Sequence, residues 1–140
     1  MREIKFRAWN EYEQCFLDNE EFAINFLGTV FKANLDAEVY NNLMNQDSFK
    51  IMQYTGFKDK HGVEIYEGDL LQSFYDDGEI HEVIWHEESA SFRVATYLDN
   101  RHGGSFAELF FMDDIHENCN EIIGNIYENT ELLEYKNEKD

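Results

Sequence analysis

The chain has 140 residues, 43% of them hydrophobic and 16% aromatic, and its 30 acidic and 11 basic side chains give a formal net charge of −19. A chain of this length buries about 68–70% of its unfolded surface on folding, which is enough for one core without disulfides or a structural metal. The negative charge repels phosphate backbones and anionic membrane surfaces. We therefore expect no direct binding to nucleic acid or to a membrane.

The sequence shows no signal for export or membrane insertion. No run approaches the roughly 18 apolar residues of a membrane span, and no apolar stretch follows the charged start at Arg2 and Glu3. Two cysteines, Cys15 and Cys119, are too few for a disulfide framework. We expect a soluble intracellular protein whose cysteines stay reduced.

The negative charge is concentrated in the second half of the sequence. Residues 1–60 carry ten acidic and seven basic side chains, whereas residues 61–140 carry 20 acidic and four basic ones. The net charges are −3 and −16. Such asymmetry is typical of solvated strand faces, and it can also mark an interaction surface.

The first 60 residues predict a small sheet. In Glu3–Trp9 charged and apolar residues alternate, which is typical of a half-buried strand with Ile4, Phe6 and Ala8 facing inward. A second short strand at Cys15–Leu17 can pair with it. Cys15, beside Phe16 and Leu17 in this strand, is expected to be a small core residue.

A short helix and another strand are expected next. Three apolar residues recur at four-residue intervals, which predicts an amphipathic helix capped near Asn34 or Asp36. These residues are Leu35, Val39 and Leu43. The run Phe49–Tyr54 that follows predicts a strand.

From there the pattern is one of short strands separated by turns. The turns contain Gly, Asp, Asn and Ser, and proline is absent from the chain, so its turns must rely on these residues. The predicted strands are Asp69–Tyr75, Ile80–His86, Ser91–Leu98, Ser105–Met112 and Glu121–Tyr127. Five short antiparallel strands at this spacing suit an SH3-like barrel. We therefore predict a mainly β (α+β) protein, with residues 1–60 as a strand and helix region packed on a barrel of residues 61–140.

Two of these strands have apolar residues on both faces. On Ser91–Leu98 one face is clear, with Phe92, Val94 and Leu98 pointing inward, but Ile80–His86 and Ser105–Met112 are apolar on both sides. A small barrel has one interior. The second face must meet the N-terminal region, another subunit or an external partner.

Three segments, Ile4–Trp9, Met52–Asp69 and Ile122–Asn129, resemble conserved blocks of the YopX family of small bacteriophage and prophage proteins. They lie at the start, middle and end of the chain. The family usually has a proline after the last block, where this chain has Thr130. The resemblance implies a phage or prophage origin, location in the cytoplasm of a bacterial host, an SH3-type barrel and no established activity.

The residue types in these blocks also predict turns, local hydrogen bonds and a bulge. Gly56, Gly62 and Gly68 are placed where turns need a positive φ, Thr55 and Asp59 can hydrogen-bond locally, and Gly124 suggests a bulge. The same middle block could instead form a binding loop in which Lys58, Asp59 and Lys60 touch a partner. The candidate motif or interaction residues are Tyr54, Gly56, Lys58, Asp59, Tyr66, Gly68, Asp69, Gly124, Asn125 and Tyr127. After them, Asn129 can cap a short C-terminal helix.

No motif for catalysis or cofactor binding is recognisable. His116 and Cys119 have a metal-like spacing, but one pair of ligands is too few for a zinc site. His81 and His86 fall on opposite faces of one strand. We predict no enzyme activity, no catalytic residue, no metal and no cofactor.

Two function classes remain. The protein can be a binding module that engages a host or phage protein through its acidic surface, with carboxylates presented as a nucleic acid presents phosphates. Alternatively, it can be a self-assembling accessory component, a homo-oligomer with the doubly apolar strands as its interface. We favour the binding module.

Overall fold

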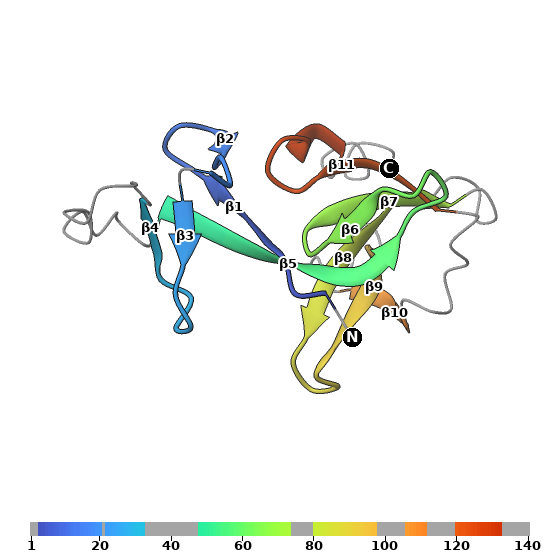
Figure 1. Cartoon of the computed structure of the whole chain (residues 1–140). Coiled ribbons are helices and arrows are strands. Elements are labelled where there is room, and N and C mark those ends of the chain that lie inside the picture. The colour runs from blue at the N-terminus through green and yellow to red at the C-terminus, as the bar shows by residue number, and fades with distance from the viewer. Residues whose placement is uncertain are drawn as a thin grey trace. The chain divides into compact units, whose positions relative to one another are not determined.

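The structure is a computed structural model of the chain, and it describes residues 3–20, 22–32, 48–73, 80–97, 106–111 and 120–132. Most of those residues lie in strands, which confirms the mainly β class. The strands are β1 (Phe6–Asn10), β2 (Cys15–Phe16), β3 (Phe22–Ile24), β4 (Val30–Lys32), β5 (Phe49–Lys58), β6 (Glu64–Tyr66), β7 (Asp69–Ser73), β8 (Ile80–His86), β9 (Ser91–Tyr97), β10 (Phe106–Phe111) and β11 (Asn120–Asn125) (Figure 1).

The chain divides into two compact units. The N-terminal unit is Lys5–Gln53, and the C-terminal unit is Tyr54–Asp140 together with Met1–Ile4. The division falls inside β5, a strand of ten residues. The predicted strand at residues 49–54 is therefore confirmed, and it continues four residues further into the C-terminal unit.

In the N-terminal unit, β1 lies between β2 and the first half of β5. The pairings are antiparallel, with Trp9 opposite Phe16 and Asn10 opposite Phe49, so the expected pairing of the first two strands is confirmed. The rings of Trp9 and Phe16 meet edge to face at 5.0 Å. Strands β3 and β4 form a separate hairpin (Figure 1).

The predicted inward face of the first strand is wrong in two of its three residues. Ala8 is buried, but Ile4 is 68% exposed and Phe6 is 42% exposed. Ile4 precedes β1 and has no place in the ladder. Instead Trp9, on the other face, is buried against Phe16. Both faces of β1 are therefore covered at its end, where Ala8, Trp9 and Asn10 are all buried.

The C-terminal unit contains a five-stranded antiparallel sheet in the order β10-β9-β8-β7-β11 (Figure 1). All five strands lie where the sequence predicted them, within two residues at their starts. The second half of β5 pairs with β6 beside this sheet, with Tyr54 opposite Tyr66. Among the described strands β10 and β11 are the two edges, so the sheet is open.

The core of the C-terminal unit is a cluster of buried aliphatic side chains contributed by four strands. Its members are Ile65, Leu71, Val83 and Val94, with Phe57, Phe92 and Ile122 packed against it. The predicted inward direction of Phe92 and Val94 is confirmed, and Leu98 lies outside the described residues. Because β6 supplies Ile65, the β5–β6 pair closes one side of the core.

Short polar side chains hold the turns of this proline-free chain. Asn10 Oδ1 accepts hydrogen bonds from the main-chain N–H groups of Tyr12 and Glu13, at 3.0 and 3.2 Å. Asn25 Oδ1 does the same for Leu27 and Thr29. These Asx turns confirm the expectation that Asn and Asp replace proline as turn formers.

Helix is almost absent from the described part of the chain. Residues 130–132 are helical, directly after Asn129 as predicted, and Leu132 N–H donates to the main-chain oxygen of Asn129 at 3.0 Å. The helix predicted from Leu35 to Leu43 lies outside the described residues. Among the described residues, no helix has the length and apolar character needed to cross a membrane.

One carboxyl group is buried on β8. Glu82 is paired between Leu70 of β7 and Ala95 of β9, and burial raises its pKa from 4.5 to about 7, with the charge of Glu67 as a second cause. The folded state therefore binds a proton that the unfolded chain has already released, so stability falls as the pH rises from about 4.5 through about 7. This difference in pKa corresponds to a loss of about 3 kcal/mol in the free energy of unfolding between low and high pH.

We predict that Glu82→Gln stabilises the protein at pH 8 and has little effect at pH 4.5. The expected gain at pH 8 is about 1–3 kcal/mol in the free energy of unfolding, because an amide carries no charge to desolvate. Urea denaturation at the two pH values measures it. The matched control is Glu88→Gln in the exposed β8–β9 turn, expected to stay within about 0.5 kcal/mol of the parent. Equal gains for Glu82→Gln at both pH values would contradict the prediction.

Candidate functional site

The turn between β5 and β6 is organised around Asp59. Its Oδ1 atom accepts hydrogen bonds from the main-chain N–H groups of His61 and Val63, at 2.8 and 2.9 Å. Asp59 N–H also donates to Val63 O, at 2.8 Å. Gly62 has a φ of +80°, which only glycine adopts without strain. The predicted local hydrogen bonding of Asp59 and the predicted glycine conformation are confirmed.

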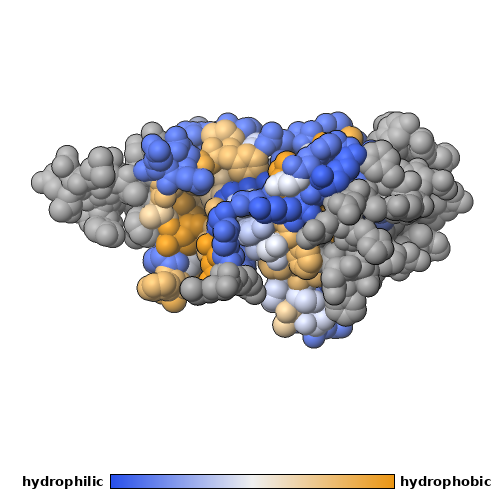
Figure 2. All heavy atoms as spheres, turned by 45° about the vertical axis from the view of Figure 1, so that its right-hand side comes forward, coloured by the Kyte–Doolittle hydropathy of each residue, from blue (hydrophilic) through white to orange (hydrophobic). Residues whose placement is uncertain are grey.

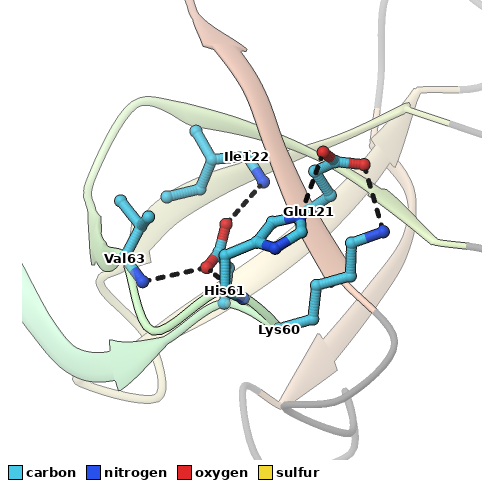
Figure 3. Close-up of polar contacts among 6 residues, drawn as sticks. Lys60, His61, Val63, Glu121 and Ile122 are labelled. Atoms are coloured by element: carbon cyan, nitrogen blue, oxygen red, sulfur yellow. Dashed lines mark hydrogen bonds and ion pairs between the residues drawn. The ribbon is translucent and has the colours of Figure 1, made fainter.

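The second oxygen of Asp59 reaches a distant part of the chain. Asp59 Oδ2 accepts a hydrogen bond from the main-chain N–H of Ile122 at 3.2 Å (Figure 3). Nearby, Lys60 N–H donates to the main-chain oxygen of Asn120 at 2.9 Å. The turn is thereby attached to β11. We call this group of residues the clasp: Asp59, Lys60, His61, Val63, Glu121 and Ile122.

Charged side chains cover the clasp on its outer side. Glu121 Oε2 lies 3.2 Å from Lys60 Nζ, and Glu121 Oε1 lies 3.3 Å from His61 Nε2 (Figure 3). Hydrogen bonding from Lys60 holds the pKa of Glu121 below its usual value, assisted by His61. Exposed pairs of this kind are screened by salt and add little to stability. The clasp is therefore held mainly by the buried carboxylate of Asp59. The contacts of Glu121 with Lys60 and His61 add little to its stability.

The ionisation of Asp59 reflects two opposing effects. Burial raises its pKa, but main-chain N–H donors at Val63, Ile122 and His61, together with the charge of His61, outweigh burial and leave the pKa below its usual value. A lowered pKa means that the ionised carboxylate stabilises the fold above the unfolded value of 3.8. This contribution is lost as the pH falls through the folded value.

The rest of the middle motif supports the start of β7. Asp69 is buried, and its Oδ2 accepts from the main-chain N–H of Tyr66 at 2.8 Å. Tyr54 and Tyr66 face each other with ring centroids 5.6 Å apart. Gly68, with a φ of +85°, donates its N–H to Val83 O and accepts from Ile126 N–H. The motif thus joins β6, β7, β8 and β11 through main-chain groups.

The closing motif forms a second polar turn. Asn125 lies opposite Asp69 in the β11–β7 ladder, and its Oδ1 accepts from the N–H groups of Tyr127 and Glu128 at 3.0 and 2.8 Å. The register shifts between Ile122 and Gly124, as the predicted bulge requires. The side chain of Asn129 accepts from Asn125 N–H, so it serves this turn as well as preceding the helix.

The structure brings the middle and closing motifs together within the C-terminal unit. Of the ten predicted residues, only Gly56 and Lys58 are classed as exposed, and Asp59 is buried with its oxygens already bonded. Contact of Lys58 or Lys60 with a partner stays a prediction. Sequence reasoning missed Glu121 and the Ile122 N–H, because a contact across 63 residues leaves no local signal.

The residues with metal-binding or nucleophilic side chains do not form a site within the described part of the chain. Within these ranges no three His, Cys, Asp or Glu side chains converge as a metal ion would require, and His116 and Cys119 lie outside them. The expectation that Cys15 is a core residue is wrong, because Cys15 is exposed on the short β2 strand. Phe16, the residue after Cys15, is the one that packs against the buried ring of Trp9.

We predict that Asp59→Asn loosens the clasp. An asparagine keeps one acceptor oxygen but presents an NH₂ group to one of the three main-chain donors, so we expect a loss of about 1–3 kcal/mol at pH 7. The difference from the parent should shrink below pH 3.8, where the parent carboxylate itself becomes protonated. Thermal and urea unfolding check this. The control Glu121→Gln weakens only the contacts with Lys60 and His61. A loss of stability as large as that of Asp59→Asn would contradict the conclusion that Asp59 holds the clasp.

We predict that Gly124→Ala destabilises the closing motif through a steric clash. A Cβ atom at this position would overlap the side chain of Asn129, so a cost of about 1–3 kcal/mol is expected. Asn129→Gly should relieve the clash in the double variant. The control is Gly56→Ala, where no atom lies within 4 Å and only the φ of +91° causes strain. Asn129→Gly should not restore the stability lost in Gly56→Ala. If the losses of stability from Gly124→Ala and Asn129→Gly simply add in the double variant, the clash is refuted.

The chain was compared with known proteins. The family model described as YopX protein matches residues 5–134. Among solved structures, protein EF1440 from Enterococcus faecalis is 27% identical with a TM-score of 0.59, and protein yopX from Bacillus subtilis is 20% identical with a TM-score of 0.61. Each alignment covers 95% of this chain and 99% of the other. No curated protein matches. Since the family model covers nearly the whole sequence, the chain belongs to the YopX family.

Proposed function

We propose that the protein is a phage- or prophage-encoded accessory protein that binds a basic host or phage protein through its C-terminal unit. The observation that carries this proposal is an exposed aromatic side chain on an acidic hairpin. Trp85 of β8 is 45% exposed, and its ring meets that of Phe92 edge to face at 5.1 Å. Tryptophan is enriched among the residues that dominate binding energy at interfaces.

Carboxylates adjoin this aromatic pair. Glu87 and Glu88 are exposed in the β8–β9 turn that follows Trp85. Side-chain hydrogen bonds brace the turn, between His86 Nδ1 and Ser89 Oγ at 2.7 Å and between the hydroxyl groups of Ser89 and Ser91 at 2.9 Å. A braced turn loses little conformational entropy on binding. The combination of a rigid aromatic anchor and adjacent carboxylates suits a basic, partly apolar partner surface.

The charge of the unit favours the same kind of partner. Counted over its sequence, the C-terminal unit has 22 acidic and seven basic side chains, a net charge of −15. Such a field accelerates association with basic surfaces and opposes nucleic acid and anionic membranes. Binding is also supported over catalysis because Asp59, Asp69 and Asn125 direct their oxygens to main-chain N–H groups of the fold.

The proposed binding unit is an SH3-like barrel, and its proposed location is the bacterial cytoplasm. The consecutive strands β7 to β10 form a meander, and β11 returns to lie beside β7. This order supports the SH3-like topology, with the open edge between β10 and β11 as the difference from a closed barrel. Self-assembly is a second candidate function. Ile80 and Ile84, on the second face of β8, are only partly buried, as a contact with a second copy through this face would require.

A capture experiment tests the binding proposal. The immobilised full chain is exposed to bacterial host lysate at about 50 mM and about 500 mM NaCl, and we expect basic proteins to be retained mainly at low salt. Trp85→Ala should reduce this capture at least about tenfold, because it removes the aromatic anchor.

Tyr12→Ala is the matched control, because Tyr12 is an 89% exposed aromatic residue in the N-terminal unit. It should capture the same proteins as the parent. If Trp85→Ala also captures the same proteins at both salt concentrations, the proposed surface is wrong.

A further inference from the structure

Two pairs of aromatic rings in the chain have nearly the same geometry. Trp9 of β1 lies opposite Phe16 of β2, with ring centroids 5.0 Å apart and an angle of 74° between the ring planes. Trp85 of β8 lies opposite Phe92 of β9, at 5.1 Å and 72°. Each pair therefore consists of a tryptophan and a phenylalanine that meet edge to face across an antiparallel ladder.

In the N-terminal unit an arginine lies on the aromatic pair. The guanidinium carbon of Arg7 is 5.0 Å from the centre of the Phe16 ring and lies over it. Arg7 precedes Trp9 by two residues, so both side chains are on the same face of β1. A cation at this distance is attracted by the negative face of the ring. The chain itself thus contains an arginine bound to an aromatic pair of this geometry.

In the C-terminal unit the corresponding position on the strand holds no cation. The residue two before Trp85 is Val83, which is buried in the core. The arginine of this hairpin, Arg93, is paired with Ile84, so it lies on the other face of the sheet. There its Nε donates to Ser91 Oγ at 3.2 Å. A cation on the Trp85 face must therefore come from another molecule.

The ring of Trp85 is accessible and fixed in orientation. The side chain is 45% exposed, and within the described part of the chain no cation lies over its ring. Phe92, which braces the ring, packs against the core cluster. A braced ring loses little conformational entropy when a partner stacks on it, and tryptophan offers a cation the most favourable aromatic face.

Negative charge lies next to this ring in the sequence. Glu87 and Glu88 follow Trp85 in the exposed β8–β9 turn. In Figure 2 the end of this hairpin lies at the lower edge of the view, where hydrophilic atoms adjoin atoms of intermediate hydropathy. A guanidinium group is planar and weakly hydrated, so it can stack on a ring while its N–H groups donate to carboxylates. An ammonium group is a compact, strongly hydrated charge, so arginine suits this surface better than lysine.

We propose that Trp85 stacks on the guanidinium group of an arginine of the partner, whose N–H groups donate to the carboxylates of Glu87 or Glu88. This inference rests on the proposed function and specifies the partner's contact as an arginine-containing basic segment. Trp85 is the residue that distinguishes arginine from lysine. The two carboxylates supply charge that either cation satisfies.

Two peptides of equal charge test the proposal. The isotopically labelled full chain is titrated with acetylated hexaarginine amide and with acetylated hexalysine amide. Binding is followed by NMR at the main-chain N–H signals of the β8–β9 turn and at the indole signals of Trp9 and Trp85. We expect hexaarginine to bind about three- to fivefold more tightly and to shift the Trp85 signal, while the signal of the buried Trp9 stays in place. Equal dissociation constants for the two peptides overturn the proposal.

Variants separate stacking from charge. In Trp85→Leu the ratio of the two dissociation constants should fall to about one, whereas Trp85→Phe keeps an aromatic face and should keep part of the preference for arginine. Glu87→Gln/Glu88→Gln should weaken both peptides by about the same factor. A preference for hexaarginine that survives in Trp85→Leu overturns the stacking. The NMR spectra also report whether each variant is folded.

Tyr12→Leu is the matched control. Tyr12 is 89% exposed between Glu11 and Glu13, but no ring of the described residues braces it. The preference for hexaarginine should be unchanged in this variant. A loss of preference as large as that of Trp85→Leu would assign the arginine contact to exposed aromatic residues in general and would overturn the proposed site.

The peptide titration and the capture from lysate give separate answers. Capture of host proteins that depends on Trp85, together with equal affinity for both peptides, overturns arginine stacking and leaves the proposed binding surface in place. A preference for hexaarginine that depends on Trp85, without any captured protein, supports the stacking and counts against a partner in the host.

Discussion

A single buried carboxylate connects the two halves of the C-terminal unit. Asp59 accepts hydrogen bonds from its own turn and from Ile122, which is 63 residues away. A carboxylate is suited to this position because it has two oxygens and no proton of its own to place. The turn it closes leads into β6, which supplies Ile65 to the core, and its distant donor Ile122 lies within β11, opposite Leu71 of β7. Together with the main-chain bond from Lys60 to Asn120 and the β11–β7 ladder, this acceptor group holds the turn against β11.

Local features of the sequence predicted much of the fold. Alternation and turn residues located the five strands of the large sheet, and the glycines at 56, 62 and 68 have the positive φ expected of them. Features that depend on distant contacts were missed. Period-two alternation did not show that both faces of β1 are covered at Ala8 and Trp9, because the cover of Trp9 comes from Phe16 of another strand. In the same way, Asp59 was recognised as a local turn former, while its bond to Ile122 has no counterpart in local sequence.

The candidate site divides into residues that hold the fold and residues that can meet a partner. The motif that identifies the family is mostly of the first kind, because its side chains are buried or bonded to main-chain groups. Exposed apolar side chains occur on both sides of this division: Ile4, Phe6 and Val63 lie within the three recognisable blocks, and outside them lie Tyr12, Phe26, Leu27 and Trp85.

The division between the two units inside β5 has a consequence for how such proteins can be recombined. No linker separates the units, because the boundary between Gln53 and Tyr54 lies within a continuous strand. Residues Phe49 to Gln53 are held in register by β1, and Tyr54 is held in register by Tyr66 of β6. A gene crossover at this boundary would join two half-strands whose alignments were fixed by different neighbours.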